Sequence, residues 1–174
     1  MHTAPMRAHH VLPAGGWDAG QETDRVLLDF DRRHRRRILL RTEGGRDVLL
    51  DLPQAARLRD GDGLALDGGG VVRVCARPEP LLEIHAHDPA ELVRIAWHLG
   101  NRHLPVQFLG GRIRIRADHV IEGMVRVLGG HVAAVEAPFD PEGGAYAGGQ
   151  RHGEHGHGEH KDDGHGHRHG GAED

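Results

Sequence analysis

Residues 81–135 read LLEIHAHDPAELVRIAWHLGNRHLPVQFLGGRIRIRADHVIEGMVRVLGGHVAAV, and their apolar pattern predicts the fold of the second half of the chain. Apolar residues recur at helical spacing in two of its segments, whereas the remaining apolar segments are short and bounded by turn residues. The resulting order is strand, helix, strand, strand, helix, strand, with the strands at 81–84, 106–109, 112–115 and 132–135. This is the order of a ferredoxin-like split βαβ domain, which we expect over residues 78–146.

Start and stop signals set the limits of the two helices. Residues 88–91 supply an N-cap aspartate, a first-turn proline and a glutamate at the third helical position, which together predict a helix start. Gly100 is expected to take the left-handed conformation that ends this helix. Gly110-Gly111 predicts a two-residue hairpin between the middle strands. Asp118 and Gly129-Gly130 are the expected start and stop of the second helix.

The first half of the chain is expected to form a small all-β module over residues 23–77. Its apolar residues fall in short runs, and glycine-rich stretches between the runs allow the chain to reverse direction. The runs lie at 25–30, 38–42, 48–52, 64–66 and 71–75. Residues 1–22 show no apolar period and are expected to be flexible. The predicted fold class is therefore α+β: a β module, a ferredoxin-like βαββαβ domain and a disordered histidine-rich tail.

Composition excludes several classes of protein. The 174 residues include 22 Lys and Arg against 26 Asp and Glu, and the net charge of −4 argues against a nucleic acid or a membrane surface as partner. A single cysteine, Cys75, excludes an intramolecular disulfide, and no apolar run approaches the roughly 20 residues that cross a bilayer. Because the N-terminus also lacks the pattern of a signal peptide, we expect a cytoplasmic protein.

One basic run interrupts the mixed charge pattern, Arg32-Arg-His-Arg-Arg-Arg37. It lies between two predicted strands, and acidic residues nearby dilute its positive field. We expect a solvated hairpin turn or a docking edge for an acidic partner, not a nucleic-acid site.

Residues 147–174 form the expected tail. From residue 151 onward the only apolar residue is Ala172, so nothing offsets the entropy cost of ordering the backbone. Imidazole suits Ni(II), Cu(II), Zn(II) and Co(II), and a flexible chain with many imidazoles can wrap several such ions. The candidate ligands in the tail are His152, His155, His157, His160, His165, His167 and His169. A solubilising tail or a purification tag is the alternative interpretation, although a tag is usually an uninterrupted histidine run.

Four motifs that follow one another along the chain resemble one known family. They are Asp51-Leu-Pro53 with Leu58-Arg-Asp-Gly-Asp62, HLGNRH at 98–103, Asp118-His119, and PFDPEGGAY at 138–146. Together they resemble the UreE family of urease accessory nickel chaperones, over about residues 23–146 and with a tail of the right kind.

The resemblance implies roles for individual histidines. His103 matches the family histidine that binds nickel at the centre of a symmetric homodimer, one from each protomer. His119 matches an auxiliary metal ligand, and the position two residues earlier, often a histidine in the family, is Ala117 here. Tail histidines are candidates to complete this auxiliary site. His98 matches a motif position that is not the chief ligand, and we expect it to support the site structurally.

The residues themselves also allow a ligand role for His103. It follows a predicted helix and precedes Pro105, so its ring is expected in an exposed loop, where a twofold axis would supply two imidazoles from one residue. Asn101 is expected to bond its own backbone, and Arg102 to pair with a nearby carboxylate. Three further histidines are expected at strand edges: His85, His87 and His131.

The resemblance implies a chaperone that delivers Ni(II), through a GTP-hydrolysing accessory partner, to the apo-urease assembly complex. The same ligands would accept Zn(II), Cu(II) or Co(II) in vitro. We expect no enzymatic activity, because the sequence contains no Walker A, nucleophile-elbow or HExxH motif. Two alternatives stay open: a histidine-rich Ni(II) or Zn(II) storage protein in which the tail is the whole function, and an interaction adaptor whose β module binds a client.

Overall fold

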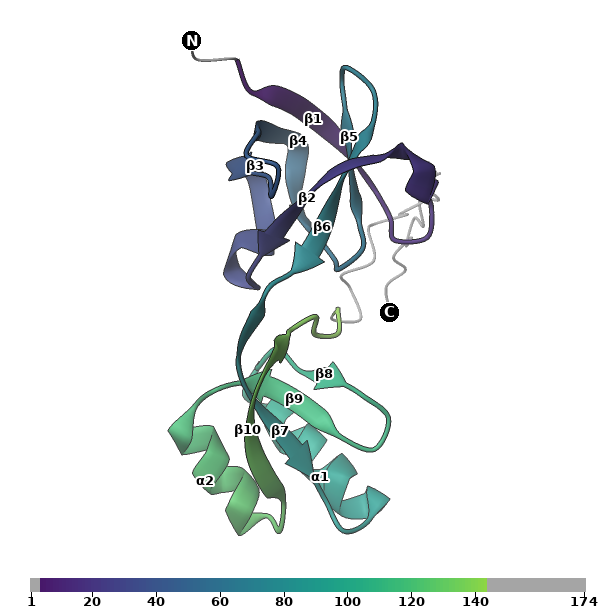
Figure 1. The fold of residues 1–174 in the computed structure, drawn as a ribbon. Coiled ribbons are helices and arrows are strands. Elements are labelled where there is room, and N and C mark those ends of the chain that lie inside the picture. The colour runs from purple at the N-terminus through teal and green to yellow at the C-terminus, as the bar shows by residue number, and fades with distance from the viewer. Residues whose placement is uncertain (1–3, 144–174) are drawn as a thin grey trace, which may run out of the picture. The chain divides into compact units, whose positions relative to one another are not determined.

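The computed structural model describes residues 4–143 (Figure 1). In this range the chain forms a six-stranded sheet, a four-stranded sheet and two α-helices, which confirms the predicted mixture of α and β structure. The predicted tail, residues 147–174, lies outside the described residues. None of the helices in the described range is long and apolar enough to cross a membrane.

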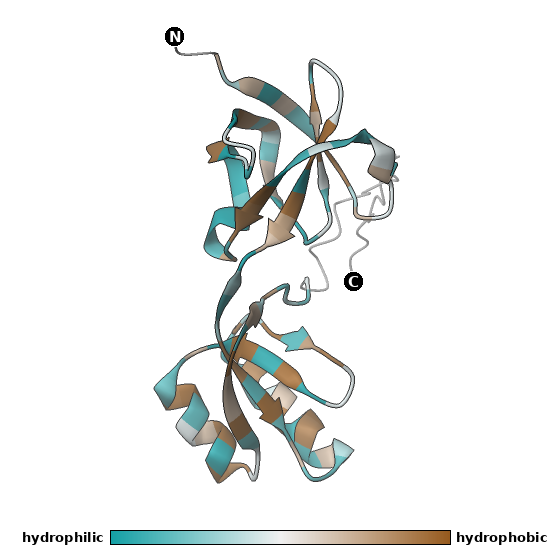
Figure 2. Ribbon diagram, viewed as in Figure 1, coloured by the Kyte–Doolittle hydropathy of each residue, from teal (hydrophilic) through white to brown (hydrophobic). Residues whose placement is uncertain are grey.

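The first sheet is built by six strands from the first half of the chain. In sheet order they are β2 (Glu22–Leu28), β6 (Val71–Ala76), β5 (Gly63–Leu66), β1 (Met6–Leu12), β4 (Asp47–Arg57) and β3 (His34–Arg41). Each of the five predicted apolar runs overlaps one of these strands. Buried positions alternate with less buried ones along β2, β4 and β6, and Figure 2 shows the apolar segments of the strands in brown. The buried core of this sheet includes Val26, Leu40, Leu50, Leu64 and Val74.

The prediction that residues 1–22 are flexible is wrong from Met6 onward. Strand β1 lies inside the sheet, where it pairs in parallel with β4 and antiparallel with β5. Ala8 is fully buried, and Nδ1 of His9 lies 2.9 Å from the carbonyl oxygen of Asp51. The sequence pattern does not predict this strand, because its fully buried side chain is only an alanine and its hydrogen-bonding partners lie far along the chain.

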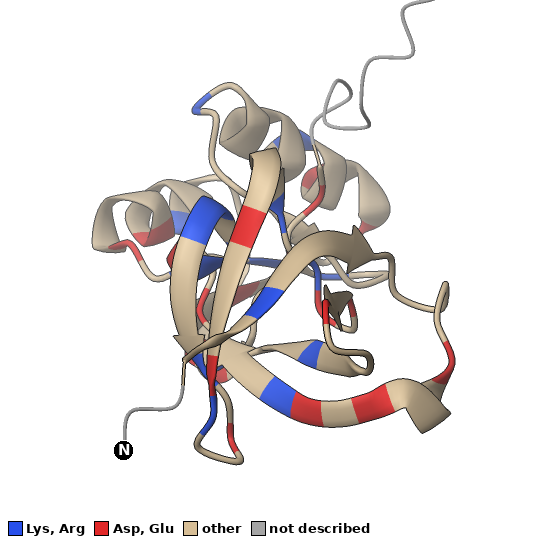
Figure 3. Cartoon of the chain, turned by 90° about the horizontal axis from the view of Figure 1, so that it is seen from above, with Lys and Arg blue, Asp and Glu red and all other residues tan. Residues whose placement is uncertain are grey.

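The basic run at 32–37 is also placed differently from the expected hairpin turn. It begins in a 3-10 turn at Asp31–Arg33 and continues into β3, which pairs antiparallel with β4 at the edge of the sheet. Arginines suit an edge strand, because it has one hydrogen-bonded neighbour and its exposed side chains stay in water. In Figure 3, acidic and basic positions lie interspersed along the strands.

The second sheet and both helices have the predicted element order. They follow one another as β7 (Pro78–His85), α1 (Pro89–Gly100), β8 (Gln107–Phe108), β9 (Ile113–Arg116), α2 (His119–Val127) and β10 (His131–Pro138). The sheet order is β10-β7-β9-β8, and every neighbouring pair is antiparallel. The helices pack on the sheet through a shared apolar core that includes Ile84, Ile95, Leu99, Ile113 and Val125.

The two helices begin at the predicted caps, but α1 ends differently from the prediction. Asp88 and Asp118 each accept hydrogen bonds from backbone N–H groups of the first turn. Helix α1 includes Gly100, and the left-handed residue is His103, with φ of 55°. The reason is that the N–H of His103 donates to the Gly100 carbonyl at 2.9 Å, so the chain makes one more tight turn before it changes direction.

The segment after β10 packs against the first, β-rich module. Phe139 is fully buried, and its ring centroid lies 5.4 Å from that of Phe30. Arg33 donates through Nη1 to a carboxylate oxygen of Asp140 at 2.9 Å and through Nη2 to the carbonyl of Phe139. Arg59 donates from Nε to the other Asp140 oxygen at 3.0 Å. A buried polar network therefore anchors this segment.

Candidate metal site

His103 lies in the loop between α1 and β8, and its side chain is exposed. Among residues 4–143 it is the only residue other than glycine with a positive φ. This conformation is uncommon outside glycine, although histidine adopts it more readily than most residues, and it costs about 1–2 kcal/mol. The backbone N–H groups of His103 and Leu104 donate to carbonyls of the last turn of α1, at 2.9 and 3.4 Å. The loop backbone that carries this imidazole is therefore fixed by the helix.

The exposed face of α1 next to this loop is apolar. Trp97 is 62% exposed, and Val93, one turn earlier on the same face, is 68% exposed. The Trp97 ring meets the ring of His98 edge to face, with their centroids 4.9 Å apart. Large apolar side chains left in water beside one another are typical of a surface that is covered in an assembly, and tryptophan is enriched at such surfaces.

The two residues expected to support the site, His98 and Asn101, lie at the end of α1. His98 is half-buried, and its carbonyl accepts a hydrogen bond from Nη1 of Arg102 at 3.0 Å. The carboxylate partner expected for Arg102 is thus replaced by a helix carbonyl, because the free carbonyls at the helix end lie closest to it. The N–H of Asn101 donates back to carbonyls of the last helical turn. Both residues shape the turn that precedes His103.

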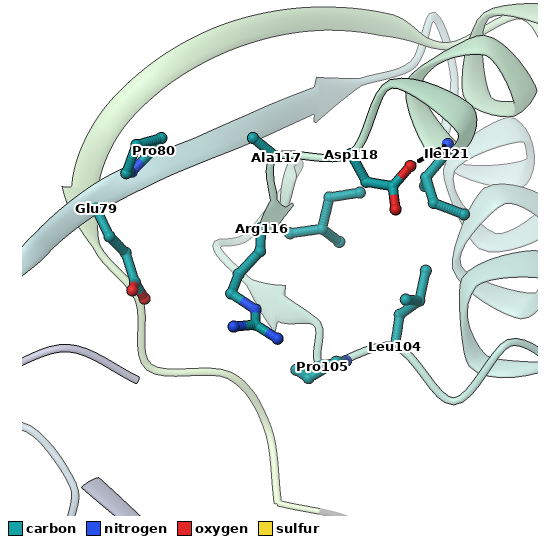
Figure 4. Close-up of a pocket in the computed structure, with 9 residues that line it drawn as sticks. Glu79, Pro80, Leu104, Pro105, Arg116, Ala117, Asp118 and Ile121 are labelled. Atoms are coloured by element: carbon teal, nitrogen blue, oxygen red, sulfur yellow. Dashed lines mark hydrogen bonds between the residues drawn. The ribbon is translucent and has the colours of Figure 1, made fainter. Parts of the chain in front are cut away.

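His119 is the first residue of α2, and its side chain is exposed. Ala117, two residues earlier, is also exposed and supplies no ligand. Leu104 and Asp118, the residues directly next to His103 and His119, line the same pocket of about 380 Å³ (Figure 4). The structure therefore brings the segments that carry the two candidate ligands to one end of the domain.

Within residues 4–143 these histidines do not form a finished metal site. In the part of the chain that the structure describes, no three His, Cys, Asp or Glu side chains are grouped so that they could hold a metal ion. Tight metal binding by His103 therefore needs ligands from a second copy of the chain or from the tail. The seven tail histidines lie outside the described residues, and their role stays a prediction.

The pocket also contains a carboxylate that sequence analysis did not single out. Glu79 lies near the start of β7, and its Oε1 atom is buried without a hydrogen-bond partner among the described residues. Burial raises the pKa of Glu79 above its usual value. Arg116 lines the same pocket and pairs with Asp31 at 3.0 Å. No local pattern signals Glu79, because only the folding of β7 against β9 brings it to this pocket.

Comparisons with known proteins agree on one family. A family model described as UreE urease accessory protein, N-terminal domain, matches residues 6–77, and one described as UreE urease accessory protein, C-terminal domain, matches residues 79–170. The chain belongs to the UreE family. The first match begins at the first residue of β1, which agrees with an ordered strand there.

Individual UreE relatives are similar over most of this chain. The urease accessory protein UreE of Bradyrhizobium sp. (strain ORS 278) is 56% identical over 142 residues, which cover 82% of this chain and 67% of that protein. The protein of the same name from Rhodopseudomonas palustris (strain HaA2) is 60% identical over 71% of this chain and 58% of its own length. The one from Beijerinckia indica is 52% identical over 86% of this chain and 87% of its own.

Membership of the UreE family supports a role in urease maturation. The UreE C-terminal domain match includes both His103 and His119 and extends into the histidine-rich segment. The candidate ligands thus lie in that one UreE domain, whereas the UreE N-terminal domain corresponds to the six-stranded sheet.

Proposed function

We propose that this UreE protein binds Ni(II) as a homodimer through His103 and delivers the ion to apo-urease during assembly of its active site. A GTP-hydrolysing accessory protein is the expected intermediary in this transfer. The observation that carries the proposal is the exposed imidazole of His103 on a left-handed turn that the end of α1 holds in place.

One imidazole from the His103 loop of each chain suits a shared site. A twofold axis that passes beside His103 places two copies of its ring next to one another, so that one residue yields two ligands. Imidazole is a good ligand for Ni(II). Two rings leave coordination positions free, and ligands of a receiving protein can occupy them before the two imidazoles dissociate. An incomplete site of this kind favours transfer over permanent retention.

The exposed face of α1 supports dimerisation at this place. Val93 and Trp97 lie within the two helical turns that precede the His103 loop, and both are more than half exposed. Tryptophan is among the residues that contribute most to binding energy when an interface buries it. A homodimer that covers this face would place the two His103 loops near its axis.

His119 and the tail are proposed as auxiliary ligands. Asp118, directly before His119, lines the same pocket as Leu104 of the His103 loop, and Ala117 offers no second imidazole beside His119. Tail histidines are then the source of further ligands, for Ni(II) and in vitro for Zn(II), Cu(II) or Co(II). No catalytic step is part of this proposal.

Activation of apo-urease tests delivery directly. The chain is loaded with Ni(II) and mixed with apo-urease and the accessory GTPase, and urease activity is recorded. We expect His103→Ala to abolish activation, a chain that ends at residue 146 to retain most of it, and His34→Ala, which removes an exposed histidine of β3, to leave it unchanged. If removal of the tail abolishes activation and His103→Ala does not, the protein is a storage protein and the proposal is wrong.

A further inference from the structure

Two histidines at the opposite end of α1 from His103 form a close pair. The Nε2 atoms of His87 and His131 lie 2.9 Å apart, their ring centroids are 4.5 Å apart, and their ring planes meet at 88°. Both side chains are exposed. Because α1 has 12 residues, about 18 Å of helix separates this pair from the His103 loop. The pair is therefore distinct from the site described above.

The backbone on the His131 side is held firmly. His131 is the first residue of β10 and lies opposite His85, the last residue of β7, in an antiparallel ladder. A Cβ atom at Gly130 would lie 2.6 Å from the side chain of Val125 and 2.8 Å from that of Ile95. Only glycine lets the turn pack this closely on the core, so the core itself positions the start of β10.

The backbone on the His87 side is fixed by the start of α1. The N–H of His87 donates to the carboxylate of Glu91 at 3.2 Å. Asp88 in turn caps the helix and accepts a hydrogen bond from the N–H of Glu91 at 2.8 Å. Both imidazoles of the pair therefore extend from backbone that ordered elements hold, which is the arrangement that a preformed ligand pair needs.

The separation of the two nitrogens fits a metal ion with ligands at right angles. Two metal–nitrogen bonds of about 2.05 Å at 90° place their nitrogens about 2.9 Å apart, whereas a tetrahedral angle needs about 3.3 Å. Right angles between ligands are typical of Cu(II) and Ni(II) sites. Without metal, the same distance is a hydrogen bond from Nε2–H of one ring to the Nε2 lone pair of the other. When a metal binds, the donor ring carries its proton on Nδ1 instead, so both Nε2 lone pairs face the ion and the charge of the pair does not change.

We propose that His87 and His131 form a second binding site for a divalent cation that prefers imidazole, Ni(II) or Cu(II), with water in the remaining coordination positions. Two protein ligands make a weaker and more rapidly exchanging site than a full set of three or four. The site depends on these two side chains alone, so metal binding by this pair does not require metal binding by His103.

Local broadening of NMR signals by paramagnetic Ni(II) tests the site in the full-length chain, because it reports where each ion binds. Ni(II) is added to the wild-type chain, to His131→Ala and to the matched control His34→Ala, which removes an exposed histidine of β3. We expect the amide signal of His87 to broaden in the wild type and the control. In His131→Ala this broadening is lost, while the signals around His103 respond as before.

The reciprocal variant and the core signals complete the test. In His87→Ala the amide of His131 is expected to lose its broadening. The amide signals of Ile95 and Val125 stay in place in both variants, because the rings removed are exposed and the core beneath them is unchanged. Broadening at His87 that persists in His131→Ala would mean that the ion is held by other ligands, such as the tail, and would overturn the proposal. Absence of broadening at His87 in the wild type, even at Ni(II) concentrations well above those that broaden the His103 region, would overturn it as well.

Discussion

Replacement of Arg33 by methionine is expected to destabilise the folded protein by about 3 kcal/mol. Only 2% of the Arg33 side chain is exposed, and its guanidinium donates to the carbonyl of Leu58 at 3.3 Å, to the carbonyl of Phe139 and to the Asp140 carboxylate. Methionine fills similar space but leaves the two carbonyl oxygens without this donor, at roughly 1–3 kcal/mol each. The loss is limited because Arg59 still pairs with Asp140, and because Nε of Arg33 has no partner among the described residues even in the wild type.

Urea unfolding followed by circular dichroism measures this loss, with Arg59→Met as the matched control. Arg59 pairs with the same carboxylate at 3.0 Å, but 41% of its side chain is exposed, so its replacement is expected to lower the free energy of unfolding by less than about 1 kcal/mol. Thermal unfolding of Arg33→Met is expected about 6–12 °C lower than that of the wild type. Equal losses in the two variants would contradict this expectation, because they would show that the buried network does not anchor the segment after β10.

Three further changes test other parts of the structure. Desolvation raises the pKa of Asp24, but hydrogen bonds, led by that from Thr42, outweigh it and lower the pKa to about 2. The stabilisation by the charged Asp24 is present above about pH 4 and is lost as the pH falls towards 2. Asp24→Asn is therefore expected to weaken the dependence of the free energy of unfolding on pH in that range. If urea unfolding at several pH values gives the same pH dependence as in the wild type, this expectation is wrong. Burial raises the pKa of Glu79, so its charged form destabilises the folded state above that pKa. Glu79→Gln is therefore expected to raise the midpoint of urea unfolding at pH 7 but not below pH 4. The same gain at both pH values would show that charge is not the cause. Finally, His103→Gly is expected to be about 1 kcal/mol more stable than His103→Ala in thermal unfolding, because glycine adopts a φ of 55° without strain; equal stability would argue against the left-handed turn.

Local signals were sufficient to predict the second half of the fold. The caps Asp88 and Asp118 and the stop at Gly129-Gly130 act within one helical turn, so a short stretch of sequence contains all the information. Strand β1 is the opposite case. Ala8 is buried because β4 and β5 pair with β1 on either side, and no pattern within residues 1–22 predicts that pairing.

The candidate site was predictable to a similar extent. The exposure of His103 follows from its place between a helix end and Pro105, whereas its left-handed backbone depends on how many turns the chain makes after Gly100. The closeness of His87 and His131, which are 44 residues apart in sequence, exists only through the pairing of β7 with β10. Strand-edge positions were predicted for both residues, but their contact could not be predicted without knowing the register in which β7 pairs with β10.

Calorimetric titration of Ni(II) into the chain truncated after residue 146, with and without His103→Ala, tests whether two chains share one ion through His103. All described helices and strands end by Pro138, so the truncation leaves both sheets and both helices intact. We expect one tight Ni(II) site for every two chains, and the loss of that site in His103→Ala. Absence of a tight site in the truncated chain, or a tight site that persists in His103→Ala, would contradict the claim that two copies of His103 share the ion.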